Sequence, residues 1–205
     1  MGKPERMQQV MELVTKSDEP VITVLSALSG TTNALVSIGD AMAEGNRQLA
    51  KENIDKLEAH YQSFVNNLLK KDATLAKAKN IVSEHFEFLN IILKISFSEA
   101  LSKDILAQGE LLSTKLFSAF LEEKNIDHVL LPALEFMSID QDDEPQVPAI
   151  KSKLLALLNQ YKDKKLFNQS LDFFNSPIRR PCIPVLLTAH DCSIQNQIIS
   201  ICNAL

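Results

Sequence analysis

Residues 26 to 33, Ser-Ala-Leu-Ser-Gly-Thr-Thr-Asn, contain side chains suited to holding a small anion. Gly30 permits a tight turn with positive φ and a close approach of the backbone to a ligand. Hydroxyl groups surround it on Ser26, Ser29, Thr31 and Thr32. They can donate hydrogen bonds to a ligand or cap a helix. This combination predicts a site for a carboxylate or a phosphate.

A buried strand and an amphipathic helix are expected to position this loop. Val21–Leu25 is rich in β-branched residues and apolar without alternation, which is typical of a strand buried on both faces of a parallel sheet. The next helix is expected to begin near Thr32 or Asn33, and its free N–H groups and positive dipole end favour an anion. The local pattern equally fits a plain strand-to-helix turn whose hydroxyls only cap the helix.

A second motif, Gln-Gly-Glu-Leu-Leu-Ser at residues 108 to 113, places one carboxylate among apolar neighbours. If this turn packs inward, Glu110 is buried and needs a cationic partner or hydrogen-bond donors. The ammonium group of a ligand would meet that need. The alternative is an ordinary exposed glutamate on a helix surface.

The other elements follow from the spacing of apolar residues. A period of three to four residues predicts amphipathic helices at residues 4 to 16, 33 to 43, 49 to 69, 73 to 97, 102 to 123 and 148 to 161. Gly45 is a plausible left-handed stop after the second of these. The apolar run at 128 to 132 predicts a second buried strand. Strands and helices in this order indicate an α/β protein.

Composition and charge restrict the class of protein. The net charge of −5 and the pI near 5.4, without clustered Lys and Arg, argue against a nucleic-acid surface. No apolar run reaches 18 residues and no secretory leader is recognisable, so no membrane partner is expected and a cytoplasmic location is the default. Three cysteines form no even disulfide framework, which favours a reducing compartment.

The segment from Leu166 onward differs in composition, since it contains no Lys, Glu or Gly. A short strand at 185 to 188 and a helix at 193 to 205 are expected within it, and Arg179 with Arg180 is read as a solvated pair. Cys182, His190, Cys192 and Cys202 are of the types that bind zinc, but they contain no close Cys-x-x-Cys pair, so a zinc site is disfavoured. No metal ligands are therefore assigned, and His60, His85 and His128 are expected to be structural.

Taken together, the motifs resemble the N-terminal lobe of the aspartate kinase (aspartokinase) family, which has the amino-acid kinase fold. The matching stretches are 26 to 33, 108 to 113, Leu-Leu-Pro-Ala-Leu-Glu at 130 to 135, and Gly-Lys-Pro-Glu-Arg-Met at 2 to 7. The resemblance implies an α/β, three-layer αβα lobe that is partial and helix-rich, with a small, mostly parallel sheet. It implies a partial kinase-like lobe at 1 to 168 and an unassigned tail at 169 to 205.

The family transfers the γ-phosphoryl group of MgATP to the side-chain carboxylate of L-aspartate, which opens the biosynthesis of lysine, threonine and methionine. The resemblance therefore implies ATP and Mg as cofactors and L-aspartate as a ligand. It implies that Ser26 and Thr32 line the aspartate and phosphate pocket and that Glu110 contacts the substrate amino group. Supporting positions are Ser29, Gly30, Thr31, Asn33 and Gly109.

The chain also departs from the family pattern. It contains neither the family's Lys-Phe-Gly-Gly-Thr-Ser loop nor its Gly-Arg-Gly-Gly-Ser-Asp segment, and all five glycines fall in the first 109 residues. Little or no kinase activity is therefore expected from the chain alone, and no catalytic residue is assigned. The alternatives are a split kinase completed by another polypeptide, a homo-oligomer, a non-catalytic aspartate-binding or interaction protein that uses residues 49 to 97, and a truncated or frameshifted gene product.

Overall fold

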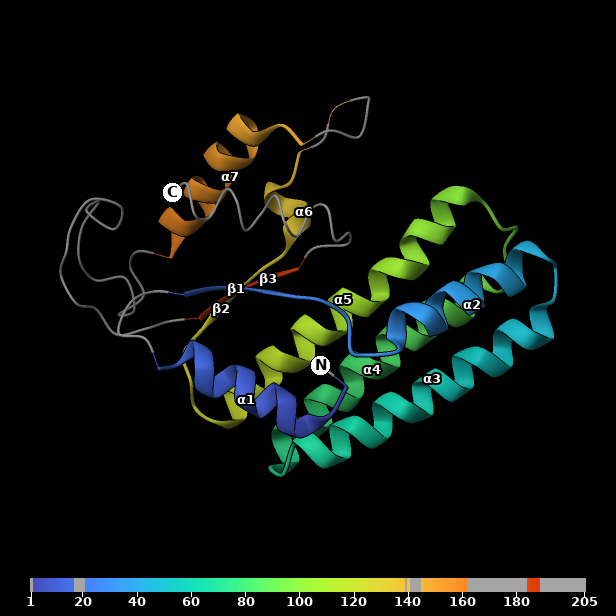
Figure 1. Ribbon diagram of the computed structural model, residues 1–205, viewed down its shortest axis with the longest axis horizontal. Helices are drawn as coiled ribbons and strands as arrows, with labels where there is room; N and C mark the ends of the chain where they lie inside the picture. The colour runs from blue at the N-terminus through green and yellow to red at the C-terminus, as the bar shows by residue number, and fades with distance from the viewer. Residues whose placement is uncertain (1, 17–20, 139, 141–144, 162–183, 189–205) are drawn as a thin grey trace.

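The computed structural model of the protein describes residues 2 to 16, 21 to 138, 140, 145 to 161 and 184 to 188. Helices dominate this part of the chain (Figure 1). In order, the elements are α1 Pro4–Val14, β1 Val21–Leu25, α2 Thr31–Ala43, α3 Arg47–Leu68, α4 Asp72–Ile92, α5 Glu99–Glu123, β2 Val129–Leu131, α6 Ala133–Phe136, α7 Val147–Gln160 and β3 Pro184–Thr188.

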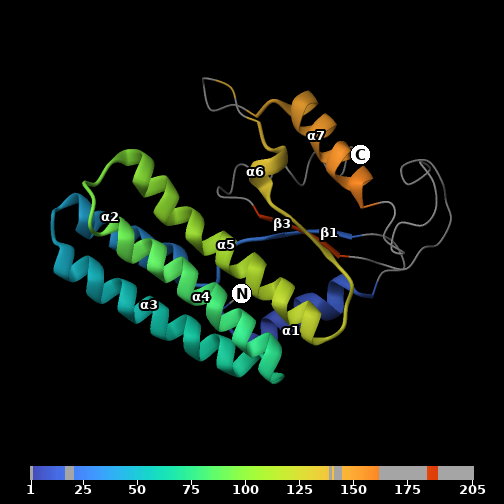
Figure 2. The same ribbon diagram turned by 180° about the vertical axis from the view of Figure 1, so that it is seen from behind.

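Four long helices, α2 to α5, lie side by side and form the larger part of the molecule (Figures 1 and 2). Each presents an apolar stripe at helical spacing to the others; that of α3 includes Ile54, Leu57, Tyr61, Phe64 and Val65. The turn from α2 to α3 uses Gly45 at φ 75°, and Asn46 caps α3 by accepting a hydrogen bond from the Leu49 N–H at 3.1 Å. The predicted left-handed stop at Gly45 is confirmed.

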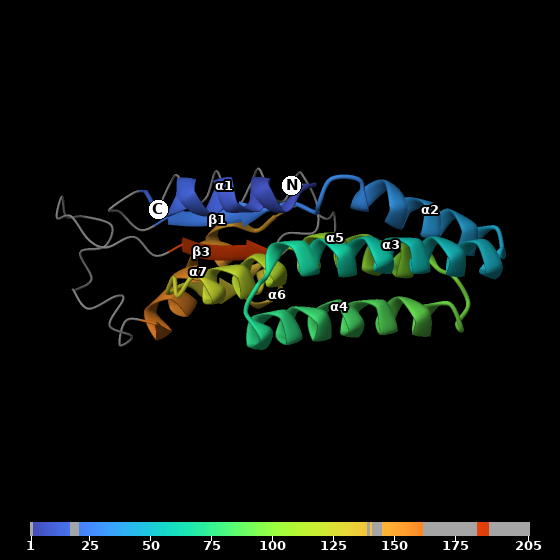
Figure 3. The same ribbon diagram turned by 90° about the horizontal axis from the view of Figure 1, so that it is seen from below.

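The described strands form a three-stranded sheet in the order β1-β3-β2, with parallel pairing on both sides of β3. Figure 3 shows β1 beside β3. Thr23 of β1 stands opposite Leu186, which in turn stands opposite Leu130 of β2. The central strand therefore comes from the segment whose composition differs from the rest. The strand predicted at 185 to 188 is present, whereas the predicted boundary at 168 lies outside the described residues.

Neighbouring side chains of the strands enter two different apolar clusters. Leu25 and Leu130 pack with α1, α5 and the helical bundle, whereas Val24, Val129 and Leu131 pack with α6 and α7. Successive side chains point to opposite faces of a strand, so the two clusters lie on opposite faces of the sheet. Figure 1 agrees, with α7 on one side of the strands and α1 and α5 on the other.

Helix α2 begins at Thr31, within one residue of the expected start near Thr32, and Gly30, at φ 87°, is its N-cap. Two other expectations about helix ends were wrong. Helix α4 ends at Ile92 instead of continuing to 97. Helix α5 begins at Glu99 rather than 102, because Ser98 is extended and its hydroxyl accepts a hydrogen bond from the Leu101 N–H. The four-residue helix α6 was not predicted because it is too short to show a period.

Several predictions lie outside the described residues. These are the helix at 193 to 205, the arginine pair at 179 and 180, and the positions of Cys182, His190, Cys192 and Cys202. Within the part of the chain that is described, no helix is long and apolar enough to cross a membrane.

Candidate functional site

The 26–33 loop connects the carboxyl end of β1 to the first turn of α2 (Figure 1). Gly30 is the N-cap of α2 and has no side chain with which to cap the helix. Whether the loop is a plain strand-to-helix turn or an anion site stays a prediction. The Thr31 N–H donates to the Leu28 carbonyl oxygen at 3.0 Å. The N–H groups of the next two residues, Thr32 and Asn33, are those that a helix N-terminus offers to an anion.

The two threonines of the loop have different surroundings. Thr31 is buried, and its hydroxyl hydrogen-bonds the phenol of Tyr61 on α3, with the oxygens 2.9 Å apart. Thr32, the next residue, is exposed, as are Ser26, Ser29 and Asn33. Side chains available to a ligand in solution are thus those of Ser26, Ser29, Thr32 and Asn33, whereas that of Thr31 holds the loop against α3.

Gly109 brings α5 into contact with the loop. A Cβ atom at this position would stand 2.9 Å from the Ala27 Cβ and 3.3 Å from both Leu35 Cδ1 and Thr31 Cγ2, so only glycine fits without displacement. Ser113, one turn further along α5, donates its hydroxyl to the Ser26 carbonyl oxygen at 2.8 Å. The two motifs singled out in the sequence, about 80 residues apart, therefore meet in space.

Glu110 is buried at this contact, with 9% of its surface exposed. Its carboxylate and the Tyr61 phenol are close enough to influence each other. Burial raises the pKa of Tyr61 above its ordinary value of 10.0, the hydrogen bond from Thr31 opposes this, and the charge of Glu110 raises it further. The alternative interpretation of Glu110 as an exposed surface residue is therefore wrong.

A network on the far side of α5 supports the same motif. His85 of α4 is buried, with its Nδ1 2.6 Å from Gln108 Oε1 and its Nε2 3.0 Å from Lys115 Nζ. An amide oxygen only accepts and an ammonium only donates, so the ring is neutral, with the proton on Nδ1. Burial lowers the pKa of His85, the bond to Gln108 opposes this, and the Lys115 charge lowers it further. The prediction that this histidine is structural agrees with these contacts.

A hollow of about 320 Å³ borders the loop on the side of α3. Its wall consists of Ser29, Gly30 and Thr31 together with Ala34, Ser37, Asn53, Lys56, Leu57 and His60. Neither Ser26 nor Glu110 lines it, so the loop presents different residues to the hollow and to α5. Among the described residues, no group of three or more His, Cys, Asp or Glu is placed to hold a metal ion.

Sequence reasoning identified the loop, Gly109 and Glu110, but it did not single out Tyr61 or Ser113. Tyr61 appeared only as one member of the apolar stripe of α3. The available signal was its hydroxyl, because a tyrosine buried in such a stripe needs a hydrogen-bond partner. Ser113 stood within the second motif, but nothing in the local sequence shows that its partner is the Ser26 carbonyl.

The chain is similar to two chloroplastic aspartokinases of Arabidopsis thaliana. It is 33% identical to aspartokinase 3 over 170 residues, covering 76% of this chain, and 32% identical to aspartokinase 2 over 166 residues, covering 74%. In both comparisons it spans only 29% of the relative's length. No protein-family model matches the chain.

The structure is similar to that of aspartokinase III from E. coli. Against that enzyme in complex with aspartate and ADP (R-state), the TM-score is 0.65 at 19% identity, covering 91% of this chain and 38% of the other. Against its complex with lysine and aspartate (T-state), the TM-score is 0.66 at 18% identity, with the same coverage. The fold is therefore that of the aspartokinases, the amino-acid kinase fold.

Proposed function

The chain is related to the aspartokinases over about three quarters of its length, and from this relation we propose that it binds L-aspartate where the 26–33 loop meets α5. The observation that carries the proposal is the close approach of Gly109 to Ala27 and Thr31 of the loop, because the next residue of α5, Glu110, is buried. The similarity to aspartokinase III, whose structure holds aspartate, supports this choice of amino acid.

The chemistry of the site complements the charges of aspartate. The ligand carries one ammonium and two carboxylates. Glu110 attracts the ammonium, while the exposed hydroxyls of Ser26 and Thr32 and the uncapped N–H groups of α2 donate to a carboxylate. Ser29, Gly30, Thr31, Asn33 and Gly109 act indirectly, by shaping the loop and its contact with α5.

We propose further that these 205 residues alone transfer little phosphoryl from ATP. Phosphoryl transfer depends on positioning and on neutralising oxygen charge. The sequence contains neither glycine-rich segment of the family, and the described residues offer no acidic or histidine cluster for Mg²⁺. The residues present do not fit MgATP. The chain would act as the amino-acid-binding part of a three-layer kinase lobe completed by another polypeptide or copy.

Calorimetric titration tests aspartate binding. Glu110→Gln keeps the size of the side chain and removes its charge, so the Kd for L-aspartate should rise tenfold or more, equivalent to about 1.4 kcal/mol. Glu87→Gln, at an exposed position on α4, is the matched control and should leave the Kd unchanged. Succinate lacks the ammonium, so any affinity for it should be the same in wild type and Glu110→Gln.

Two results would contradict this assignment. One is the absence of L-aspartate binding by the wild type. The other is an equal Kd in Glu110→Gln and Glu87→Gln while circular dichroism shows both to be folded.

Phosphotransfer is tested separately, by formation of aspartyl hydroxamate in the presence of MgATP. A turnover far below 1 per second, the lower end of typical enzymes, is expected. Turnover at about 1 per second or faster from the isolated chain would refute the proposed lack of activity.

A further inference from the structure

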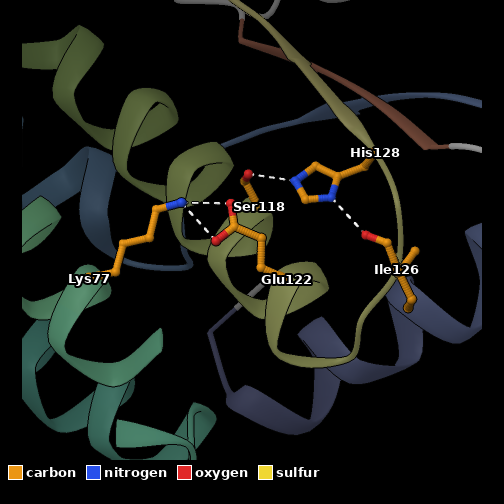
Figure 4. A network of polar contacts seen from close by, with 5 residues as sticks. All are labelled: Lys77, Ser118, Glu122, Ile126 and His128. Carbon is orange, nitrogen blue, oxygen red and sulfur yellow. Dashed lines mark hydrogen bonds and ion pairs between the residues drawn. The ribbon is translucent and has the colours of Figure 1, made fainter. Parts of the chain in front are cut away.

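A serine, a histidine and a backbone carbonyl form a chain of hydrogen bonds at the end of α5 (Figure 4). Ser118 lies on α5, and its Oγ is 2.6 Å from Nε2 of His128, which directly precedes β2. The other ring nitrogen, Nδ1, is 3.0 Å from the carbonyl oxygen of Ile126. This arrangement plays no part in the proposed aspartate site.

The partners determine where the protons lie. A carbonyl oxygen only accepts, so Nδ1 of His128 carries the ring proton and donates it to Ile126. Nε2 of the neutral ring therefore bears a lone pair, and the Ser118 hydroxyl donates to it. A hydroxyl nucleophile, a base that accepts its proton and a third group that orients the base are the three components of an activated serine.

The chain of hydrogen bonds opens into a hollow of about 610 Å³, a volume suited to a small ligand. Ser118 itself is 8% exposed. Lys77 and Glu122 on the wall neutralise each other, with the ammonium 2.6 and 2.7 Å from the two carboxylate oxygens. Asp127 leaves the remaining wall acidic, which disfavours anionic substrates and favours neutral ones.

The hollow is separate from the aspartate site. His128 precedes the amino end of β2, whereas Ser26 follows the carboxyl end of β1, and both strands run parallel to β3. Along α5, Ser118 is eight residues beyond Glu110, or about 12 Å at the helical rise. The two sites can therefore be tested independently.

We propose that Ser118 is a nucleophile that accepts the acyl group of small neutral esters, with His128 as its general base. The Ser118 Oγ forms a bond to the ester carbonyl carbon while its proton passes to His128 Nε2. The bond from that carbon to the leaving oxygen then breaks, and the departing alcohol takes the proton. Water attacks the acyl-serine in the same way, releasing the acid and restoring Ser118. Asn125 also lines the hollow, and the proposal assigns its side-chain amide as the donor to the carbonyl oxygen.

The test uses the full chain with p-nitrophenyl acetate, following nitrophenol release and locating the acetyl group by mass spectrometry of peptides. Acetylation of Ser118 is expected in the wild type and none at this position in Ser118→Ala. In His128→Gln the amide oxygen still accepts from the serine hydroxyl but is not a base, so acetylation should slow by roughly 100-fold or more. Ser63→Ala, at an exposed serine of α3, is the control and should react like the wild type.

A neutral ester should also react faster than a nitrophenyl ester that carries a carboxylate on its acyl group. The proposal is overturned if the wild type acquires acetyl groups only on other residues. It is equally overturned if Ser118 reacts as fast in folded His128→Gln as in the wild type.

Discussion

The carboxylate of Glu123 links the end of α5 to the turn between α3 and α4, and its replacement gives a sharp test of the packing. The side chain is only 4% exposed. Its Oε2 accepts hydrogen bonds from the backbone N–H of Lys70 at 2.8 Å, the N–H of Lys71 at 3.1 Å and the hydroxyl of Thr74 at 2.8 Å. One atom therefore satisfies three donors about 50 residues away in the sequence.

Glu123→Gln removes the charge and turns part of the group into a donor facing other donors. A hydrogen bond to a charged group contributes about 1.5–3 kcal/mol, and the three bonds are not additive because the amide oxygen retains some of them. We expect the free energy of unfolding to fall by about 2–3 kcal/mol, which corresponds to a Tm lower by roughly 4–12 °C for a chain of this size. Glu122→Gln, beside it but in an exposed pair with Lys77, should cost no more than about 1 kcal/mol.

The effect of Glu123 should also depend on pH. Burial raises the pKa of its carboxyl, but the hydrogen bonds from Lys71, Lys70 and Thr74 lower it more, so the folded-state pKa lies below the ordinary value of 4.5. A carboxyl with a depressed pKa stabilises the fold above its unfolded-state pKa, and this contribution disappears as the pH falls through the folded-state value. The difference between wild type and Glu123→Gln should therefore shrink below about pH 4.5.

Urea unfolding at pH 7, 5 and 3.5 measures this difference directly. A loss at pH 7 no larger than that of Glu122→Gln would refute the assigned hydrogen bonds. A loss that stays the same from pH 7 to pH 3.5 would refute the ionic character of the cap.

Two further predictions concern the loop and its contact with α5. Gly109→Ala places a Cβ 2.9 Å from that of Ala27, so it should lower the free energy of unfolding by about 1–3 kcal/mol and weaken L-aspartate binding. In the control Gly39→Ala the nearest neighbour of the new Cβ would be 3.9 Å away, so this variant should be neutral or slightly stabilising. Denaturation and calorimetric titration measure the two effects. Equal effects of the two alanines would contradict the close approach. Tyr61→Phe should cost about 0.5–1.5 kcal/mol through the lost bond to Thr31. Burial raises the pKa of Tyr61, so its phenol ionises above pH 10.0, and Tyr61→Phe should remove this step from the ultraviolet titration. Because the folded-state pKa is raised, the neutral phenol stabilises the fold below pH 10.0, and this contribution is lost as the pH rises through the folded-state pKa. A titration curve unchanged by the substitution would contradict the burial of this phenol.

The sequence by itself determined the long helices and the first strand, and it predicts an anion-binding chemistry for the 26–33 loop. Apolar spacing is a local property, so it located α2 to α5 to within a few residues except where a cap intervened, as Ser98 does between α4 and α5. Residue type likewise predicted the left-handed turn at Gly45. These features depend on residues close together along the chain. The family was indicated by the resemblance of motifs in four separate stretches, whose order is also a property of the sequence.

Only the tertiary structure decided which side chains meet. The contact of Gly109 with Ala27 and the pairing of Ser118 with His128 depend on how α5 lies against its neighbours. The burial of Thr31 rather than Thr32 depends on how α2 packs against Tyr61 of α3. The insertion of β3 between β1 and β2 is of the same kind. Most of these contacts join segments far apart in sequence, and a pattern of local spacing fixes which face of an element is apolar but not which partner covers it.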